Sequence, residues 1–303
     1  MRRGNASWST CAIVVASGCG RFGFDSESRG GALADASPQV ARCDPSKPFG
    51  PLTPLSQVNS PGADLGLELV DDGLVGFLWS DRLGVERIFE TTRTTTADAF
   101  GPAVLVPVLP GTGNDRDPCP SGDGLSIVFS STRSGGGGGS WDLWMSSRAS
   151  RAAQFDPPVP VVATNDSAPN WGGYLISSGL ALYYIRDQDM KVARRASPSD
   201  PFGAPASLGS LNTVFAEFEP AVTPDELTIL FASDRPNGKG RLDIYAATRA
   251  STAVPFEAPV SLDELNSIGD DIPSWIAPDL CEIHMTQSTA TQGSEIFHAS
   301  RPL

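Results

Sequence analysis

Histidine, nucleophile motifs and phosphate-binding loops are scarce or missing in this sequence of 303 residues. The only two histidines, His284 and His298, have no third ligand at zinc spacing, which favours ordinary strand positions over a metal site. No Gly-x-Ser-x-Gly motif occurs, so a hydrolase domain with a nucleophile elbow is excluded. The glycine run at 135–139 is not followed by a helix pattern, which excludes a phosphate-binding loop there.

Charge is also low, and it is mostly of one sign. Only 19% of the residues are charged, and 35 acidic residues against 22 Lys and Arg give a net charge of -13. A surface this acidic repels nucleic acid and anionic lipid, so neither is an expected partner. The 31 glycines and 26 prolines, together with short and regular apolar runs, are typical of an all-β chain rich in turns.

The apolar run at the N-terminus is too short to span a bilayer, and this end has the pattern of a secretory signal. Two arginines precede an apolar core at 11–16, and Ser17, Gly18 and Cys19 follow it. This end resembles a bacterial lipobox, in which the cysteine becomes the lipidated first residue of the mature protein. We therefore expect a signal peptide at 1–18, a lipid anchor on Cys19 and a flexible tether at 19–41. A free thiol in an ordinarily secreted protein is the alternative.

A strand–turn–strand unit occurs five times, and its clearest copy is the segment 227–249, LTILFASDRPNGKGRLDIYAATR. In each copy an apolar strand leads into a turn, and a second strand then ends on an arginine. These arginines are Arg93, Arg148, Arg195, Arg249 and Arg301. A phenylalanine stands seven residues after each of the first four, at Phe100, Phe155, Phe202 and Phe256. So regular a spacing identifies a repeat protein.

The two ends of the repeat array are incomplete, and together they make one whole repeat. The segment from Arg42 to Phe49 has the spacing of a repeat end, whereas the last copy stops after Arg301 without its phenylalanine. An N-terminal strand that completes the last blade is how a closed propeller hides its edges. We therefore predict an all-β fold over 42–303, a five-bladed β-propeller with four-stranded blades. Residues from about 49 to 55 are expected to supply the outer strand of the fifth blade.

The repeat resembles that of TolB-type, WD-like β-propellers, in which a turn Asp-Gly precedes an apolar strand, Ser-Asp-Arg, a Gly-rich turn and Asp-Ile-Tyr. The resemblance covers about 42–303 and is strongest at 233–235 and 243–245. Blade 3 departs from the pattern, with Gln188 in place of the arginine. The resemblance implies a propeller and, commonly, an envelope location with protein or glycan binding. It does not fix a ligand, because one fold supports many functions.

An acidic residue is expected to open each innermost strand, at Asp64, Asp115, Asp166, Glu217 and Asp271. Because inner strands line the channel of a propeller, these acids are expected to form a ring near one mouth. Such a ring could hold calcium, face a cationic partner, or supply the acid and base of a glycosidase. The alternative, which the repetition favours, is that the acids pair with the recurring arginines inside the blades.

Cysteine usage suggests a covalent link at the closure. Cys43 precedes the sealing strand and Cys281 begins the second strand of the same blade, so both should lie at one end of blade 5. We predict a disulfide between them that pins the ring closure. Cys119, on an inner strand of another blade, is then a buried free thiol.

Function is expected where the repeats diverge, which is above all in blade 3. The residues 171–174 are interpreted as an insertion after Pro169 that is aimed near the channel mouth. Aromatic residues at a rim stack on sugars or anchor a protein partner, which makes Trp171 and Tyr174 the candidate binding residues. Packing between blades is the alternative role for both.

The sequence thus predicts a monomeric, lipid-anchored propeller of the bacterial envelope, attached to the outer membrane and either periplasmic or surface-exposed. It is expected to bind an envelope protein or a polysaccharide through one face and to carry out no chemistry. No cofactor is expected, with calcium as the open alternative. The competing hypothesis is a glycan-processing or glycan-binding propeller that uses carboxylates at the channel mouth.

Overall fold

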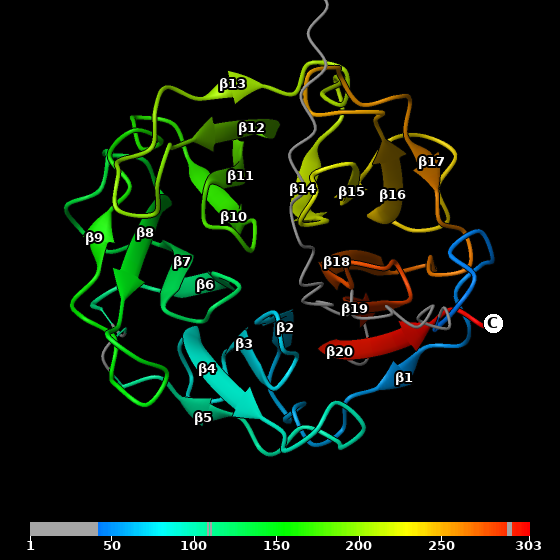
Figure 1. Ribbon diagram of the computed structural model, residues 1–303, viewed down its shortest axis with the longest axis horizontal. Coiled ribbons are helices and arrows are strands. Elements are labelled where there is room, and N and C mark those ends of the chain that lie inside the picture. Colours follow the sequence, from blue (N-terminus) through cyan, green and yellow to red (C-terminus); the bar gives the residue numbers. More distant parts are fainter. Residues whose placement is uncertain (1–41, 108, 110, 290–292) are drawn as a thin grey trace, which may run out of the picture. The chain divides into compact units, whose positions relative to one another are not determined.

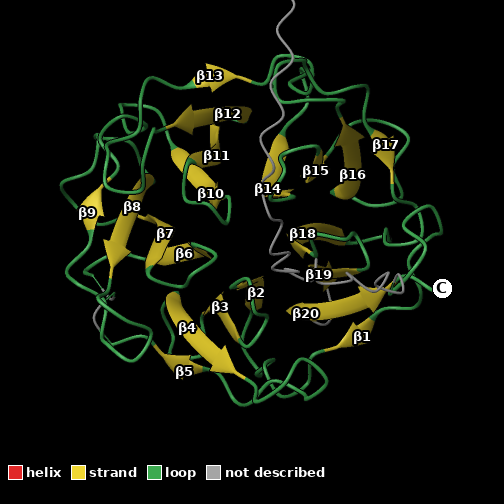
Figure 2. Cartoon of the chain, in the orientation of Figure 1, coloured by secondary structure: helices red, strands yellow, loops and turns green. Residues whose placement is uncertain are grey.

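The computed structural model describes residues 42–303, apart from 108, 110 and 290–292. The signal peptide, the lipid anchor on Cys19 and the tether are predicted for 1–41 and lie outside the described residues. The described part consists of strands, turns and loops (Figure 2). Within it, no helix has the length and hydrophobicity that crossing a bilayer requires.

The strands form five antiparallel sheets of four strands each, which are the blades of a ring (Figure 1). Blade 1 consists of β2 (Asp64–Leu69), β3 (Val75–Ser80), β4 (Arg87–Thr92) and β5 (Val104–Leu105). Blade 2 consists of β6 (Asp115–Pro120), β7 (Ser126–Ser131), β8 (Asp142–Ser147) and β9 (Val159–Pro160). Blade 3 consists of β10 (Asn170–Leu175), β11 (Ala181–Arg186), β12 (Asp189–Arg194) and β13 (Ala206–Ser207).

The remaining two blades complete the ring. Blade 4 consists of β14 (Glu217–Val222), β15 (Thr228–Ser233), β16 (Asp243–Thr248) and β17 (Val260–Ser261). Blade 5 consists of β18 (Asp270–Ile276), β19 (Glu282–Thr289), β20 (Gly293–Ser300) and β1 (Thr53–Pro54). The first strand of each blade, from β2 to β18, faces the centre of the ring (Figure 1). The five-bladed propeller with four-stranded blades is therefore confirmed.

Blade 5 is completed by the N-terminal strand, as the split repeat predicts. β1 pairs with β20, with Thr53 opposite His298. Just before this pairing, the Gly50 amide donates a hydrogen bond to the Ser300 carbonyl at 2.8 Å. Figure 1 shows the blue strand β1 beside the red strand β20. The ring is thus closed by contacts between the two ends of the described chain.

The arginine and phenylalanine that recur seven residues apart stack on each other in every blade. In blade 4 the Arg249 guanidinium lies 4.3 Å from the centroid of the Phe256 ring, and its Nε donates to the Glu226 carbonyl at 2.7 Å. The same stacking joins Arg301 to Phe49 at 4.1 Å, across the closure. The spacing therefore reflects a cation–π contact between the end of the third strand and the loop that follows it.

Blade 3 is aligned differently from the sequence prediction. Its inner strand begins at Asn170, which pairs with Arg186, whereas Asp166 lies in the loop before the strand. The prediction that Asp166 opens this strand was wrong, because an uncharged asparagine holds the position that is acidic elsewhere. The segment between β9 and β10 is as long as the one between β5 and β6, so no residues are inserted before β10. Residues 171–174 therefore belong to the strand itself and are not an insertion after Pro169.

Two cysteines lie at the closure. Cys43 and Cys281 form a disulfide, with Cα atoms 5.6 Å apart and a sequence separation of 238 residues. Cys43 lies before β1 and Cys281 immediately before β19, so the bond joins the N-terminal segment to the second strand of blade 5. Cys119, on the inner strand β6, is a buried thiol without a disulfide partner among the described residues.

Candidate functional site

The acidic residues that open the inner strands are buried inside their blades and lie outside the central cavity. In blade 2, Asp115 is 1% exposed and accepts hydrogen bonds from Arg133 Nη2 at 2.6 Å and from Ser131 Oγ at 2.7 Å. The equivalent pairs in blades 1 and 4 are Asp64 with Arg82 and Glu217 with Arg235. In these three blades the carboxylate neutralises the charge of the arginine at the Ser-Asp-Arg position.

The other two members of the predicted ring have different partners. Asp271 in blade 5 is buried and accepts a hydrogen bond from Gln287 Nε2 at 2.8 Å. Asp166 in blade 3 is partly exposed and pairs with Arg186, whose Nε lies 2.9 Å from Asp166 Oδ2. In the described ranges, no three His, Cys, Asp or Glu side chains converge closely enough to hold a metal ion. The five acids therefore do not meet as one ring.

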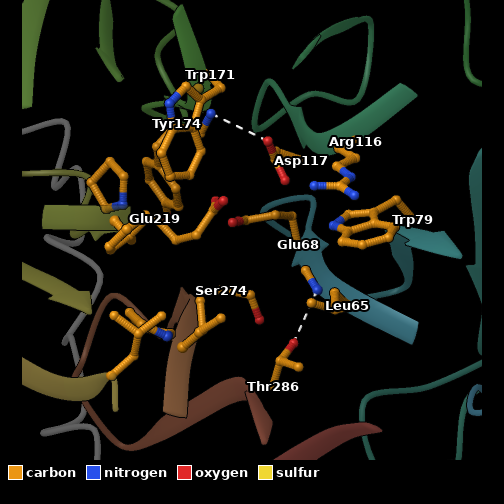
Figure 3. Close-up of a pocket in the computed structure, with 18 of the residues that line it drawn as sticks. Leu65, Glu68, Trp79, Arg116, Asp117, Trp171, Tyr174, Glu219, Ser274 and Thr286 are labelled. Atoms are coloured by element: carbon orange, nitrogen blue, oxygen red, sulfur yellow. Dashed lines mark hydrogen bonds between the residues drawn. The ribbon is translucent and has the colours of Figure 1, made fainter. Parts of the chain in front are cut away.

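The centre of the propeller holds a cavity of about 360 Å³ with walls from all five inner strands (Figure 3). Trp171 and Tyr174 on β10 are both in its wall, so the structure places the two predicted binding aromatics together. The second and third residues of β2, β6, β10 and β14 also line it, as do the third and fourth of β18. The residue types at these positions differ between the blades, so each blade contributes different side chains to the cavity wall.

Three carboxyl groups face this cavity, and none of them is among the residues predicted above. They are Glu68 on β2, Asp117 on β6 and Glu219 on β14. Glu68 is 8% exposed. Figure 3 shows the carboxyl groups of Glu68 and Glu219 pointing toward one another, with Asp117 nearby. Asp117 and Glu219 share a strand position in only two blades, and Glu68 has no acidic counterpart, so a search for an acid common to all five repeats does not find them.

Two of these acids occupy a position at which the inner strands have an irregular backbone. The register of β2, β6, β10 and β14 shifts at the third residue, where the backbone is left-handed. Glycine occupies this position in blades 1 and 3, with φ of 69° at Gly66 and 60° at Gly172. Blades 2 and 4 have Asp117 (φ 51°) and Glu219 (φ 43°) instead. Such strained non-glycine residues cluster at functional sites. An acid at a strand position that is glycine in other blades is therefore the sequence feature that could have indicated this site.

Asp117 and Glu219 form a hydrogen-bonded pair of unlike carboxyl groups. Asp117 accepts a hydrogen bond from the Gly172 amide at 3.2 Å, and the Ser130 hydroxyl and the Arg116 guanidinium also favour its charged form. Burial raises the pKa of both acids, and the Asp117 carboxylate raises the pKa of Glu219 further. The Asp117 charge therefore holds Glu219 toward its protonated form. The two carboxyl groups have unlike environments, a feature that catalytic carboxyl pairs share.

Glu68 has no comparable partner. Among the residues that the structure describes, none donates a hydrogen bond to its carboxyl group. Burial raises the pKa of Glu68 well above its ordinary value, and the charges of Glu219 and Asp117 raise it further. The carboxyl group is therefore held toward its protonated form inside the cavity.

One arginine in the wall, Arg116, is already tied to groups outside the three acids. Its Nε donates to Glu86 Oε2 at 2.6 Å. Its guanidinium lies 4.7 Å from the ring centroid of Trp79 and 4.9 Å from that of Trp141. Two indoles and a carboxylate thus fix Arg116 in place, which makes it a rigid part of the wall.

Aromatic rings from blades 3 and 4 form another part of the wall. The rings of Trp171 and Phe218 lie against each other with centroids 5.1 Å apart, and both residues are partly exposed. Tyr174 is buried, and its hydroxyl has a raised pKa because of that burial. Flat apolar rings beside carboxyl groups can pack against one face of a small polar ligand while the acids exchange hydrogen bonds with it.

A second cavity of about 360 Å³ lies between blades 5 and 1, and its wall contains both histidines. His284 on β19 pairs with His298 on β20, and their ring centroids are 5.7 Å apart. Burial, followed by the charges of His298 and Arg93, lowers the pKa of His284 to about 3. His284 is therefore an uncharged residue at an ordinary strand position.

No described protein family and no curated protein matches this sequence. Solved structures with the same fold include the catalytic domain of a GH62 α-L-arabinofuranosidase from Coprinopsis cinerea. It matches with a TM-score of 0.53 at 12% identity, over 84% of this chain and 97% of that one. A family 117 glycoside hydrolase from the marine bacterium Zobellia galactanivorans matches with a TM-score of 0.54 at 11% identity, over 84% of this chain and 90% of that one.

TolB from Acinetobacter baumannii also matches, with a TM-score of 0.48 at 13% identity over 81% of this chain. The chain spans 56% of that protein's length. TolB proteins and glycoside hydrolases are therefore both among the structures that resemble this one. At these identities the likeness shows the fold alone.

Proposed function

We propose that this protein binds a saccharide in the central cavity of the propeller. The observation that carries the proposal is the meeting, in about 360 Å³ at the hub, of partly exposed aromatic rings and carboxyl groups from different blades. Aromatic rings pack against the apolar faces of sugar rings, while carboxyl groups exchange hydrogen bonds with sugar hydroxyls. A cavity of this size suits one or two sugar units better than the face of a folded protein. Of the two expected partners, a polysaccharide is therefore favoured.

Two of the proteins with this fold are glycoside hydrolases by name, one of them an α-L-arabinofuranosidase. Their names suggest a class of ligand to test first, and the likeness itself concerns the fold. No cofactor enters the proposal. The three acids and the aromatic rings of this chain's own hub are the groups that support it.

Glycoside hydrolysis is a second candidate, which the unequal protonation of Asp117 and Glu219 favours. A glycosidase needs one carboxylic acid to protonate the leaving oxygen and one carboxylate to act as base or nucleophile. The Asp117 charge holds Glu219 toward its protonated form, which is what the acid of such a pair needs. The test is the release of reducing sugar from an oligosaccharide that the protein binds, and its loss in a Glu219→Gln variant that still binds. Binding without release would leave recognition as the function.

Replacing Trp171 by Ala is expected to weaken saccharide binding by about 2 kcal/mol, or roughly 30-fold, because an aromatic anchor is lost. Isothermal titration calorimetry with arabino-, xylo- and cello-oligosaccharides measures the change. Phe215→Ala is the matched control, since this ring is 38% exposed and lies outside the cavity wall. Equal affinity in a folded Trp171→Ala variant would contradict the proposed site, and the absence of binding to any saccharide would contradict the function.

We further propose that a lipid on Cys19 holds the protein at the bacterial envelope. The support is the sequence pattern alone, since Cys19 lies outside the described residues. Bacteria that express the full chain and grow with labelled palmitate should label the wild type, and a Cys19→Ser variant should carry no label. A variant labelled as strongly as the wild type would rule out the anchor at this residue.

A further inference from the structure

Acids outnumber cations around the central cavity. Two arginines line it, Arg116 and Arg241. Arg116 pairs with Glu86, and Arg241 pairs with Asp270. Both of these carboxylates lie outside the cavity wall, so neither arginine is dedicated to the three acids that face the cavity. The wall therefore carries a surplus of carboxyl groups.

Of the three acids, Glu68 is the one whose carboxyl group has no partner. Asp117 accepts the Gly172 amide, and Glu219 hydrogen bonds to Asp117. Glu68 makes no such contact with any described residue, although it is buried and its carboxyl group points into the cavity (Figure 3). Burying an acid without a partner is costly, so this group is suited to a ligand that brings a donor and a positive charge.

A second polar group in the same wall also lacks a partner. The Ser274 side chain is 5% exposed, and its Oγ makes no hydrogen bond with any residue of the described ranges. Ser274 lies on β18, the inner strand next to β2, which carries Glu68. Buried polar atoms in proteins are almost always hydrogen bonded, so this hydroxyl, in the same cavity wall as Glu68, marks a place for a polar ligand atom.

The aromatic part of the wall suits a cation as well as a sugar ring. Indole faces attract positive charge, and in this cavity Trp79 and Trp141 already flank the Arg116 guanidinium. Trp171 and Phe218 present further ring surface to the same space. An ammonium group on a sugar would therefore meet carboxyl groups and aromatic faces together.

We propose that the saccharide bound in this cavity carries a free amino group, whose ammonium is held by the Glu68 carboxylate with the Ser274 hydroxyl beside it. This inference rests on the proposed saccharide binding. A neutral sugar supplies hydroxyls but no charge to a buried carboxylate, and an acetylated amine supplies one N–H donor. An ammonium supplies three donors and a positive charge that favours the ionised form of Glu68, which burial otherwise holds toward its protonated form. The ligand class is therefore an amino sugar in which the amine is not acetylated.

The test compares three trisaccharides with one β-1,4-linked glucose skeleton, which carry at C2 a hydroxyl (cellotriose), an acetamide (N-acetylglucosamine trimer) or an amine (glucosamine trimer). Calorimetry on the wild type should show about tenfold to hundredfold tighter binding of the glucosamine trimer, because a charge-assisted hydrogen bond is gained. Glu68→Gln should remove this preference, so that the glucosamine trimer binds no more tightly than cellotriose. Asp200→Asn removes the same charge from an exposed loop and should keep the preference.

Each outcome separates the inference from the function on which it rests. Equal binding of the three trisaccharides, or tightest binding of cellotriose, would overturn the amino-sugar inference and leave saccharide recognition standing. Binding of none of them would overturn both. If spermidine binds as tightly as the glucosamine trimer, the cavity recognises ammonium alone and the sugar part is wrong. If Glu68→Gln does not fold, the order of affinities in the wild type decides the question.

Discussion

Replacing Asp115 by Asn is expected to lower the free energy of unfolding by about 3–5 kcal/mol, because the change leaves a buried arginine without its counter-charge. The Asp115 carboxylate is 1% exposed, and the Arg133 side chain that donates to it is only 11% exposed. Arg133 also donates to the Leu109 carbonyl at 2.6 Å and stacks over the Phe129 ring at 4.9 Å. It cannot swing into solvent without losing these contacts.

Blade 3 supplies a matched control for this experiment. Asp166→Asn removes the same charge from an acid that pairs with Arg186 at the surface, where the two side chains are 43% and 39% exposed. An exposed ion pair contributes about 0–1 kcal/mol, so this variant should unfold close to the wild-type urea concentration. Urea denaturation at constant slope measures both variants. Similar losses in the two variants would contradict the distinction between buried and exposed pairs.

The same variant separates a structural acid from a ligand-binding acid. Asp115 lies outside the cavity wall, so Asp115→Asn should keep the saccharide affinity of the wild type at temperatures where it is folded. Glu68→Gln should behave in the opposite way, because it removes a carboxyl group that faces the cavity and with it the preference for the glucosamine trimer. A loss of affinity in folded Asp115→Asn would return the ring acids to the list of binding residues.

The fold was predictable because its strongest contacts are local and repeated. The arginine-to-phenylalanine spacing is visible in the sequence because one cation–π contact recurs in every blade, as between Arg249 and Phe256. The closure was predictable because Arg301 lacks a phenylalanine of its own, whereas the segment from Arg42 to Phe49 has the end of a repeat without its beginning. The recurring Arg–Phe contact therefore makes the number and order of the blades predictable from the sequence.

The candidate site was harder to predict because it is made from residues that do not repeat. Glu68, Asp117 and Glu219 come from three blades and meet only because the ring brings the inner strands to one axis. No spacing of residues along the sequence indicates that these three side chains face one cavity. Trp171 and Tyr174 both line the hub cavity, although they belong to β10 and not to the predicted insertion, and their binding role stays a prediction. Asp166 was predicted at the wrong place because the repeats were aligned on their acidic residues. In blade 3 the first position of the inner strand is held by the uncharged Asn170.

Removing the disulfide between Cys43 and Cys281 is expected to cost about 2–5 kcal/mol of stability. The bond closes a loop of 238 residues, so it greatly restricts the unfolded chain. The strand pairing that it reinforces is short, because β1 contributes only two residues, Thr53 and Pro54, to the fifth blade. Urea denaturation of the wild type with and without dithiothreitol, and of the variant with both cysteines replaced by Ala, measures the effect.

The double variant is its own control, because dithiothreitol should destabilise the wild type and leave the variant unchanged. A wild type that is insensitive to the reductant would show that the bond is absent or contributes nothing. Saccharide affinity should survive reduction below the unfolding midpoint, since the disulfide lies at the outer closure and the cavity is built from the inner strands. If affinity falls with each increment of urea before the blades unfold, closure and hub are not one cooperative unit. If binding and fold are lost together, the seal at blade 5 stabilises the geometry of the whole hub.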